Sequence, residues 1–369
     1  MKAYLNGKIF TGTETLSNAG VLAEYGKVRA IVPASEVPDS VQKIDLQGNL
    51  LAPALVDLQI YGGNGHLFGE FPSVHALEAT RAYCRSGGAS WFLPTVATNS
   101  EAIMYAAIDA VRQYWQQGGP GVLGLHLEGP YINPEKRGAH LLPFIQKPDI
   151  EGVKNLLEYG RGVIKMMTIA PEVFSKNVLD YVLDQEIILS AGHSNATFAE
   201  ARSAFDAGIP AATHLFNAMS PLQHRAPGMV GAILDHPTVC VSVVADGHHV
   251  DFAAIRIAKK ILLDRLFLIT DAVAENPDGQ YTHRLAGDKY VVADGTLSGS
   301  ALTMLQAVKN CVQQIGIPLE ESLRMASLYP ARVMGLDQRL GKIAPGFEEN
   351  FIVLDGSNDL VRIIDNSGT

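Results

Sequence analysis

Cysteine is scarce in this chain, and the few that are present do not suggest a disulfide framework. Cys84, Cys240 and Cys311 are odd in number, lie far apart and form no CxxC pair. Such usage is typical of a reducing compartment. No apolar run is long enough to cross a bilayer, and the first ten residues lack the hydrophobic segment of a secretory signal peptide. We therefore expect a cytoplasmic protein with no membrane partner.

Positively charged residues are also fewer than negatively charged ones. The chain has 29 Lys and Arg against 38 Asp and Glu, a formal net charge of −9. This balance argues against nucleic acid or an anionic membrane as the main partner. It leaves room for a small anionic substrate, because a few local Arg and His side chains can capture one phosphate. With 369 residues, 47% of them hydrophobic, the chain can fold around its own core without disulfides or a structural metal.

The two ends of the sequence share a pattern of short β-strands. Near the amino terminus the predicted strands alternate with turn residues such as Asn6-Gly7 and Gly26-Lys27, which is typical of a small β-structure. Isolated hairpins are barely stable in water, so we expect residues 1–52 and 341–369 to build one small β-sandwich domain together. The predicted strands are Lys2–Leu5, Lys8–Phe10, Val21–Ala23, Val28–Val32, Phe351–Leu354 and Leu360–Ile364.

Between the ends, residues 53–340 alternate short apolar runs with helix-like stretches rich in Ala, Leu, Glu and Arg. Near-continuous apolar strands alternating with helices indicate a parallel sheet buried on both faces. Eight such units, at roughly thirty residues each, fit a (β/α)8 TIM barrel. A doubly wound open sheet is the alternative, weakened by the lack of a GxGxxG turn. The predicted strands are Leu55–Ile60, Ser90–Val96, Val122–Leu127, Ile164–Ile169, Ile187–Ser190, Ala211–Leu215, Val239–Val244 and Leu266–Thr270.

Ionisable residues gather where these strands end, which is the catalytic rim of such a barrel. One carboxylate and two imidazoles are a usual protein set for a catalytic zinc ion, and Glu128, His193 and His214 supply it from the ends of the third, fifth and sixth predicted strands. A single buried His is more often a hydrogen-bonded core residue than a ligand. Three candidate ligands on one rim, with Asp271 beyond them, favour a metal site.

The expected chemistry is metal-assisted hydrolysis of an amide. A bound metal lowers the pKa of water and polarises a carbonyl, and Asp271 is suited to pass a proton from that water to the leaving nitrogen. Capping of the following helix is the simpler role for Asp271 alone. In nearby loops, His140, Arg225 and His249 offer groups that bind phosphate, although solvated loop charges are equally common for an Arg.

These motifs resemble the amidohydrolase superfamily, and within it the N-acetylglucosamine-6-phosphate deacetylases, over nearly the whole chain. The resemblance implies hydrolysis of the 2-acetamido group of N-acetylglucosamine 6-phosphate to glucosamine 6-phosphate and acetate. It rests on His126–Pro130, Gly192–Thr197, Thr213–Met219, Arg225 with Pro227-Gly228, Gly231–Asp235, Ala245–Asp251, Thr270–Ala272 and Met325–Ala331.

The resemblance also assigns roles to residues. It implies Glu128, His193 and His214 as ligands of one divalent metal ion, with Zn2+ expected, Asp271 as catalytic acid and base, and His140 beside the acetyl carbonyl. It further implies a homodimer in which Arg225 reaches the neighbouring active site. The expected substrate-binding residues are Ala139, Asn217, Ala218, Arg225, His249, Leu302, Thr303 and Met304.

One departure from the wider superfamily concerns the number of metal ions. Many amidohydrolases carry His-x-His at the end of the first barrel strand, whereas this chain has Gln59-Ile-Tyr61. A neutral amide and a phenol are poor zinc ligands, so we expect a single metal ion. Lys165 lies on the fourth strand, where related enzymes use a carbamylated lysine between two metals. With Glu128 available, we interpret Lys165 as an ordinary strand lysine.

Two other functions remain open from the sequence alone. One is hydrolysis of another amide or an aminopurine by the same superfamily, which the missing histidines and the Arg225 region disfavour. The other is a catalytically inactive scaffold, which the joint presence of the three ligands and Asp271 disfavours. Metal analysis would separate the scaffold from the enzymes.

Overall fold

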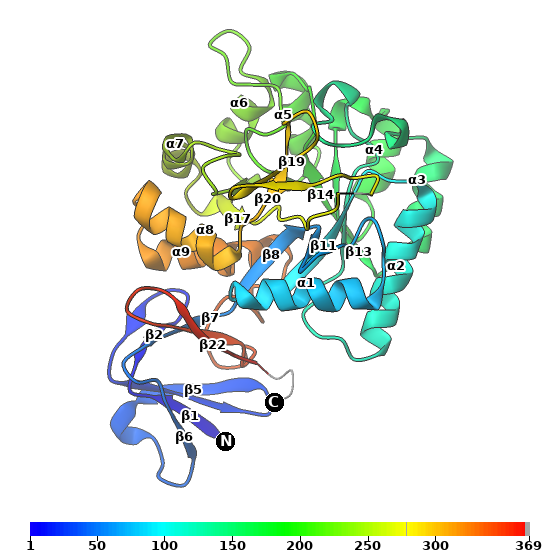
Figure 1. Cartoon of the computed structure of the whole chain (residues 1–369). Coiled ribbons are helices and arrows are strands. Elements are labelled where there is room, and N and C mark those ends of the chain that lie inside the picture. Colours follow the sequence, from blue (N-terminus) through cyan, green and yellow to red (C-terminus); the bar gives the residue numbers. More distant parts are fainter. Residues whose placement is uncertain (278, 366–369) are drawn as a thin grey trace. The chain divides into compact units, whose positions relative to one another are not determined.

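The computed structural model describes residues 1–277 and 279–365 (Figure 1). This part of the chain divides into two compact units. One unit consists of Leu58–Tyr83 and Phe92–Leu302. The other combines Met1–Asp57, Cys84–Trp91 and the chain from Thr303 onward. Within residues 1–277 and 279–365, no helix has the length and apolarity needed to cross a membrane.

The eight parallel strands of the central sheet pair in strict chain order. Its ends also meet, because the Asp271 backbone N–H donates to the Gln59 carbonyl at 3.0 Å and the Tyr61 N–H to the Ala272 carbonyl at 2.8 Å. The predicted (β/α)8 TIM barrel is therefore confirmed. Its strands are β8 (Leu55–Ile60), β11 (Ala89–Ala97), β12 (Leu125–Glu128), β13 (Ile164–Ile169), β14 (Ile188–Ala191), β15 (Ala211–Ala212), β16 (Cys240–Val244) and β17 (Leu266–Ile269).

Two barrel strands are shorter than the sequence predicts. The run Ala211–Leu215 is a strand only at β15, because the backbone enters a left-handed turn at His214, where φ is 37°. The run Val122–Leu127 becomes regular only at Leu125, after Gly124 with φ of 150°. Burial explains why the apolar runs are nevertheless recognisable: every residue of β8 and β17 is buried, as expected for a sheet covered on both faces.

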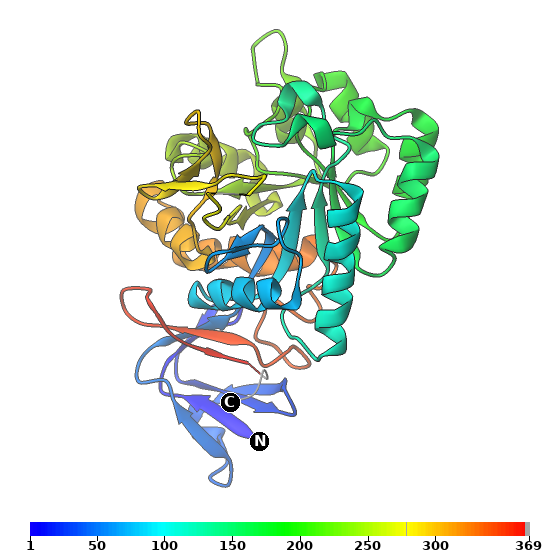
Figure 2. The ribbon, with the colours of Figure 1, turned by 45° about the vertical axis from the view of Figure 1, so that its right-hand side comes forward.

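The helices of residues 74–262 connect successive strands and lie on the outside of the barrel (Figure 1 and Figure 2). Local capping fixes where several begin. Ser100 accepts a hydrogen bond from the Ile103 N–H, and Thr197 forms a reciprocal capping box with Glu200. The helices are α1 (Val74–Ser86), α2 (Glu101–Gln116), α3 (Ile150–Tyr159), α4 (Lys176–Leu183), α5 (Phe198–Asp206), α6 (Gly228–Asp235), α7 (Phe252–Leu262), α8 (Met304–Asn310), α9 (Leu319–Ala326) and α10 (Leu328–Val333).

Two small antiparallel elements stand beside the strand ends. The hairpin of β9 (Gly62–Gly63) and β10 (His66–Leu67) follows β8. A three-stranded sheet of β18 (Arg284–Ala286), β19 (Lys289–Val291) and β20 (Leu297–Ser300) follows β17; we call residues 279–300 the flap. Leu67 of the hairpin and Tyr281 of the flap share an apolar cluster with Val273, so these insertions are packed against each other.

The second unit contains two sheets, one of which is built from both ends of the chain. Strand β21 (Phe351–Leu354) pairs with β7 (Leu50–Pro53), which places carboxyl-terminal and amino-terminal strands in one sheet. A shared core joins this sheet to the other, with the rings of Tyr4 and Phe351 edge to face at 5.7 Å. The expected small β-sandwich domain is thus confirmed, whereas its boundaries at residues 52 and 341 stay a prediction. The further strands are β1 (Lys2–Leu5), β2 (Lys8–Phe10), β3 (Thr15–Leu16), β4 (Ala19–Glu24), β5 (Lys27–Pro33), β6 (Gln42–Asp45) and β22 (Leu360–Ile364).

Candidate metal centre and active site

A cavity of about 190 Å3 lies among the loops that follow the barrel strands. Its walls combine apolar side chains, such as Leu67 and Val273, with a concentration of ionisable groups, which is the usual make-up of a small-molecule site. Most of the residues that the sequence singled out line it. They are Glu128, Ala139, His140, His193, His214, Asn217, Ala218, His249 and Asp271.

The backbone turns sharply at three of these residues. His193 follows β14 with φ of 48°, His214 follows β15 with φ of 37°, and Asp271 follows β17 with φ of 54°. Positive φ is uncommon for residues with a side chain, and such conformations cluster where function holds them in place. Glu128 is different, because it is the last residue of β12 itself. All four side chains are buried.

Three candidate ligand atoms form a nearly regular triangle inside the cavity. The His214 Nε2 lies 3.0 Å from the His193 Nε2 and 3.0 Å from the Glu128 Oε1, and the His193 Nε2 lies 3.3 Å from the same oxygen. Ligands bound tetrahedrally to zinc at 2.0–2.1 Å are separated by about 3.3 Å. The chemistry and the spacing of this donor set therefore fit one divalent ion with an open coordination position.

The tautomer of His193 also suits a ligand. Its Nδ1 lies 2.8 Å from the Lys136 carbonyl oxygen, which can only accept, so Nδ1 carries the proton of the neutral ring. The Nε2 lone pair then faces Glu128 and His214. Metal-binding histidines are commonly held in this way, by a carbonyl on the other ring nitrogen.

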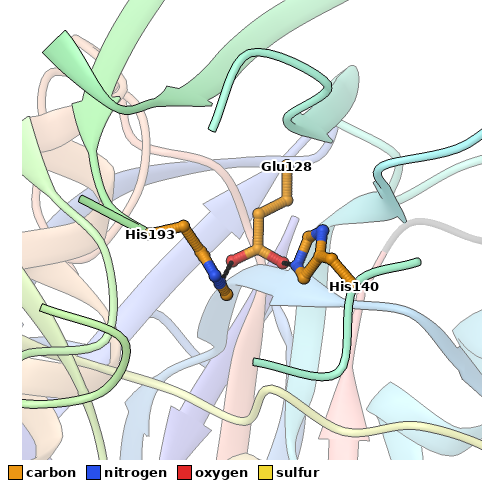
Figure 3. Close-up of side chains that lie close together, drawn as sticks. All are labelled: Glu128, His140 and His193. Carbon is orange, nitrogen blue, oxygen red and sulfur yellow. Dashed lines mark hydrogen bonds and ion pairs between the residues drawn. The ribbon is translucent and has the colours of Figure 1, made fainter. Parts of the chain in front are cut away.

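His140 has the opposite tautomer. Its Nδ1 accepts from the Thr98 backbone N–H at 3.2 Å, so the proton of the neutral ring sits on Nε2, which donates to the Glu128 Oε2 at 3.0 Å. Figure 3 shows Glu128 between His193 and His140, with one imidazole at each carboxylate oxygen. Glu128, His140 and His193 are close enough to hold an ion, but an Nε2 that carries a proton cannot bind a metal. The geometry thus favours His214 as the third ligand and His140 as a hydrogen-bond donor.

Burial and these contacts set the charges of Glu128 and His140. Burial raises the pKa of the Glu128 carboxyl, but the surrounding His193, His140 and His214 outweigh it, and that pKa falls well below its usual range. Burial lowers the pKa of His140 to about 4. At neutral pH the site therefore pairs an ionised Glu128 with a neutral His140 that keeps its Nε2 proton.

Gln59 contacts both carboxylates of the cavity, and Tyr61 contacts one of them. The Gln59 Nε2 donates to the Asp271 Oδ1 at 2.7 Å and to the Glu128 Oε1 at 3.0 Å. The Tyr61 hydroxyl donates to the Glu128 Oε2. Burial, with Glu128 and Asp271 nearby, raises the pKa of Tyr61 well above its usual value, so the phenol stays a donor. Two neutral donors thus stand in the sequence where many amidohydrolases have two histidines, and Gln59 joins the two carboxylates.

Asp271 lies between Gln59 and His249. Burial raises the pKa of its carboxyl, although His214 and His249 oppose the rise. The His249 Nε2 is 3.6 Å from the Asp271 Oδ2, while its Nδ1 hydrogen-bonds the Asp246 Oδ2 at 2.6 Å. Asp246 thereby orients the His249 ring toward Asp271. A buried carboxyl with a raised pKa beside a metal site is well suited to move a proton.

Four predicted substrate residues lie outside the lining of this cavity. Arg225 is exposed in the loop before α6, Leu302 and Met304 are buried, and the Thr303 side chain caps α8 by accepting from the Gln306 N–H. Lys165 does not line the cavity either. These placements leave the expected roles of Arg225, Leu302, Thr303 and Met304 as predictions.

The flap supplies further lining residues, of which Tyr281 and His283 were not singled out from the sequence. Tyr281, His283 and Ser298 line the cavity, and the His283 Nδ1 lies 2.9 Å from the Ser298 Oγ. Burial lowers the pKa of His283 to about 4. The stretch Gln280-Tyr-Thr-His283 follows Asp271 in the sequence by only a few residues. That proximity is the one signal that could have pointed to them.

Comparison with known proteins shows the family of the chain. A model described as "Amidohydrolase family" matches residues 50–367, and one described as "NagA composite domain" matches residues 1–51. The N-acetylglucosamine-6-phosphate deacetylase of Haemophilus influenzae is 36% identical over 99% of this chain and 98% of its own. The N-acetylgalactosamine-6-phosphate deacetylase of Escherichia coli O157:H7 is 37% identical over 92% and 91%.

A solved structure shares the same fold from end to end. The N-acetylglucosamine-6-phosphate deacetylase of Pasteurella multocida superimposes with a TM-score of 0.92 at 37% identity, over 97% of this chain and 96% of its own. Family models and relatives thus cover both the barrel and the terminal β-domain. The chain belongs to the amidohydrolase family.

Proposed function

We propose that this protein hydrolyses the 2-acetamido group of N-acetylglucosamine 6-phosphate, giving glucosamine 6-phosphate and acetate. The observation that carries the proposal is the triangle of Glu128 Oε1, His193 Nε2 and His214 Nε2, with Asp271 in the same cavity. The names of the H. influenzae and P. multocida relatives support the substrate. An inactive scaffold would have no need to keep this arrangement buried and ordered.

We assign Glu128, His193 and His214 as ligands of a single divalent ion, with Zn2+ expected. Such an ion supplies a lowered pKa for water and a polarised carbonyl. Asp271 accepts the proton of the attacking water, since it is the carboxylate of the cavity that is not assigned to the metal, and returns it to the departing nitrogen. The neutral His140 donates a hydrogen bond from its Nε2–H to the acetyl carbonyl oxygen as negative charge develops there.

The remaining cavity residues are assigned to the sugar phosphate. Ala139, Asn217, Ala218 and His249 line the cavity, which supports their assignment as substrate contacts. Arg225 is exposed, and its assigned role is to reach the active site of a second subunit, which makes the protein a homodimer. Leu302, Thr303 and Met304 are assigned to the substrate side on the resemblance alone. The cytoplasmic location stays a prediction from cysteine usage.

The experiment is acetate release by metal-loaded protein from three compounds. N-acetylglucosamine 6-phosphate should be turned over, and the unphosphorylated sugar should be a far poorer substrate, because the phosphate anchors the reacting group. N-acetylgalactosamine 6-phosphate is the third compound, since one relative is named for it. No turnover of N-acetylglucosamine 6-phosphate, or equal turnover with and without the phosphate, refutes the proposal.

A further inference from the structure

Glu172 collects three hydrogen bonds although it does not line the cavity. It lies in a helical turn, Pro171–Val173, that follows β13. Its Oε1 accepts from the Asn195 backbone N–H at 2.6 Å and from the Asn133 Nδ2 at 2.9 Å. Its Oε2 accepts from the Ser194 hydroxyl at 2.7 Å. Hydrogen bonds to an ionised carboxylate are stronger than neutral ones.

The three donors belong to two loops, and both loops contact or contain His193. Ser194 and Asn195 directly follow it after β14, and Asn133 belongs to the loop after β12, where the Asn133 backbone N–H donates to the His193 carbonyl at 2.9 Å. The Glu172 carboxylate therefore joins the two loops on either side of the His193 peptide. His193 has φ of 48°, a conformation that persists only where the surroundings hold it.

The same contacts continue to the next loop. The Ser194 backbone N–H donates to the Ala218 carbonyl at 3.0 Å, and the Ser220 N–H donates to the Ser194 carbonyl at 3.1 Å. Ala218 lines the cavity. A segment fixed by Glu172 thus carries a metal ligand at its start and supports a wall of the substrate pocket through Ser194.

A surface carboxylate in water would not gather this set of partners. Within residues 1–277 and 279–365, Glu172 forms no ion pair with Lys, Arg or His, and its partners are one backbone N–H, one amide and one hydroxyl. This is the pattern of a group that orders loops. Residues that orient metal ligands commonly change metal affinity by ten- to a hundredfold when they are removed.

We infer that Glu172 is a positioning residue, which holds the loops after β12 and β14 so that the His193 Nε2 stays at the metal position. The inference rests on the proposed assignment of His193 as a metal ligand. It concerns metal binding, so it can fail while acetate release stands, and it can hold if the substrate is a different amide.

The test compares Glu172→Ala with Glu172→Gln and with Glu135→Ala as a matched control. Glu135 lies in the neighbouring loop, and its Oε2 accepts from the Asn195 Nδ2 at 2.8 Å, so its loss removes one contact of the same segment. Zinc affinity of the metal-free proteins is measured by competition with a chromophoric chelator. Melting temperatures are recorded with and without zinc.

We expect Glu172→Ala to raise the zinc dissociation constant by at least tenfold and to shrink the rise in melting temperature that zinc produces. Glu172→Gln, which keeps an acceptor for Asn133 and Asn195, should weaken zinc binding less, and Glu135→Ala should stay within about twofold of wild type. If Glu172→Ala does not fold, Glu172→Gln against Glu135→Ala decides the question. Wild-type zinc affinity in Glu172→Ala overturns the inference, as does wild-type affinity in Glu172→Gln when only that variant can be measured. Equal losses of affinity at positions 172 and 135 overturn it too.

Discussion

Removing the His140 imidazole separates two interpretations of the cavity. The ring could be a metal ligand, as its closeness to Glu128 and His193 would allow. The Thr98 backbone N–H on Nδ1, however, leaves the proton on Nε2, and burial keeps the ring neutral because its pKa falls to about 4. On this basis His140 donates to the acetyl oxygen, and His140→Ala should retain one metal ion per chain.

The expected loss of rate follows from that role. A donor aimed at the oxygen that becomes negative in the transition state is worth about 2.7–4 kcal/mol, or about 10²–10³ in kcat. Most of the loss should appear in kcat, because the bond strengthens only in the transition state. Acetate release gives kcat and KM, and elemental analysis gives the metal content. His75→Ala, an exposed histidine on α1, is the control. Metal-free His140→Ala would refute the reasoning, as would unchanged kcat.

Three further predictions concern other groups of the barrel unit. Asp271→Asn should keep its metal and lose about 10²–10⁴ in kcat, and full activity in this variant would remove Asp271 from its role. Gln59→His combined with Tyr61→His should raise the metal content from one to two ions per chain, measured by elemental analysis after dialysis; a second ion already present in wild type would contradict the single-site assignment. His283 has its pKa lowered to about 4 by burial, so the unfolded chain, with an ordinary pKa of about 6.5, binds the proton more readily. Stability should therefore fall as the pH drops from about 6.5 to 4, and relative to His283→Asn the metal-free wild type should lose about 2–3 kcal/mol between pH 7 and 4.5 in urea unfolding. Parallel losses in the two proteins would show that His283 is not the cause.

Much of the barrel could be predicted because burial on two faces leaves a simple pattern. Strands β8 and β17 are buried throughout and mostly apolar, with Asp57 and Gln59 as the polar exceptions in β8, so their boundaries stand out against the helices. Polar residues directly after such strands must then lie on one rim. That reasoning brings Glu128, His193, His214 and Asp271 together from the sequence alone.

The features of the site that could not be predicted depend on contacts between residues far apart in the chain. The ring nitrogen of His140 that carries the proton is decided by the Thr98 backbone N–H, 42 residues away. Gln59 likewise joins Glu128, 69 residues away in the chain, to Asp271, 212 residues away. Hydrophobic periodicity contains no information about such pairings. The turn at His214 escapes prediction for a related reason, since its left-handed backbone is held by the loop and not by a local residue preference.

The central claim is that one metal ion, held by Glu128, His193 and His214, is sufficient for hydrolysis. Titration of zinc into the metal-free protein, with acetate release from N-acetylglucosamine 6-phosphate measured at each step, tests it most directly. Activity should be absent without metal, rise in proportion to bound zinc and level off at one equivalent per chain. Activity in the metal-free protein, or a rise that continues to two equivalents, would contradict the claim.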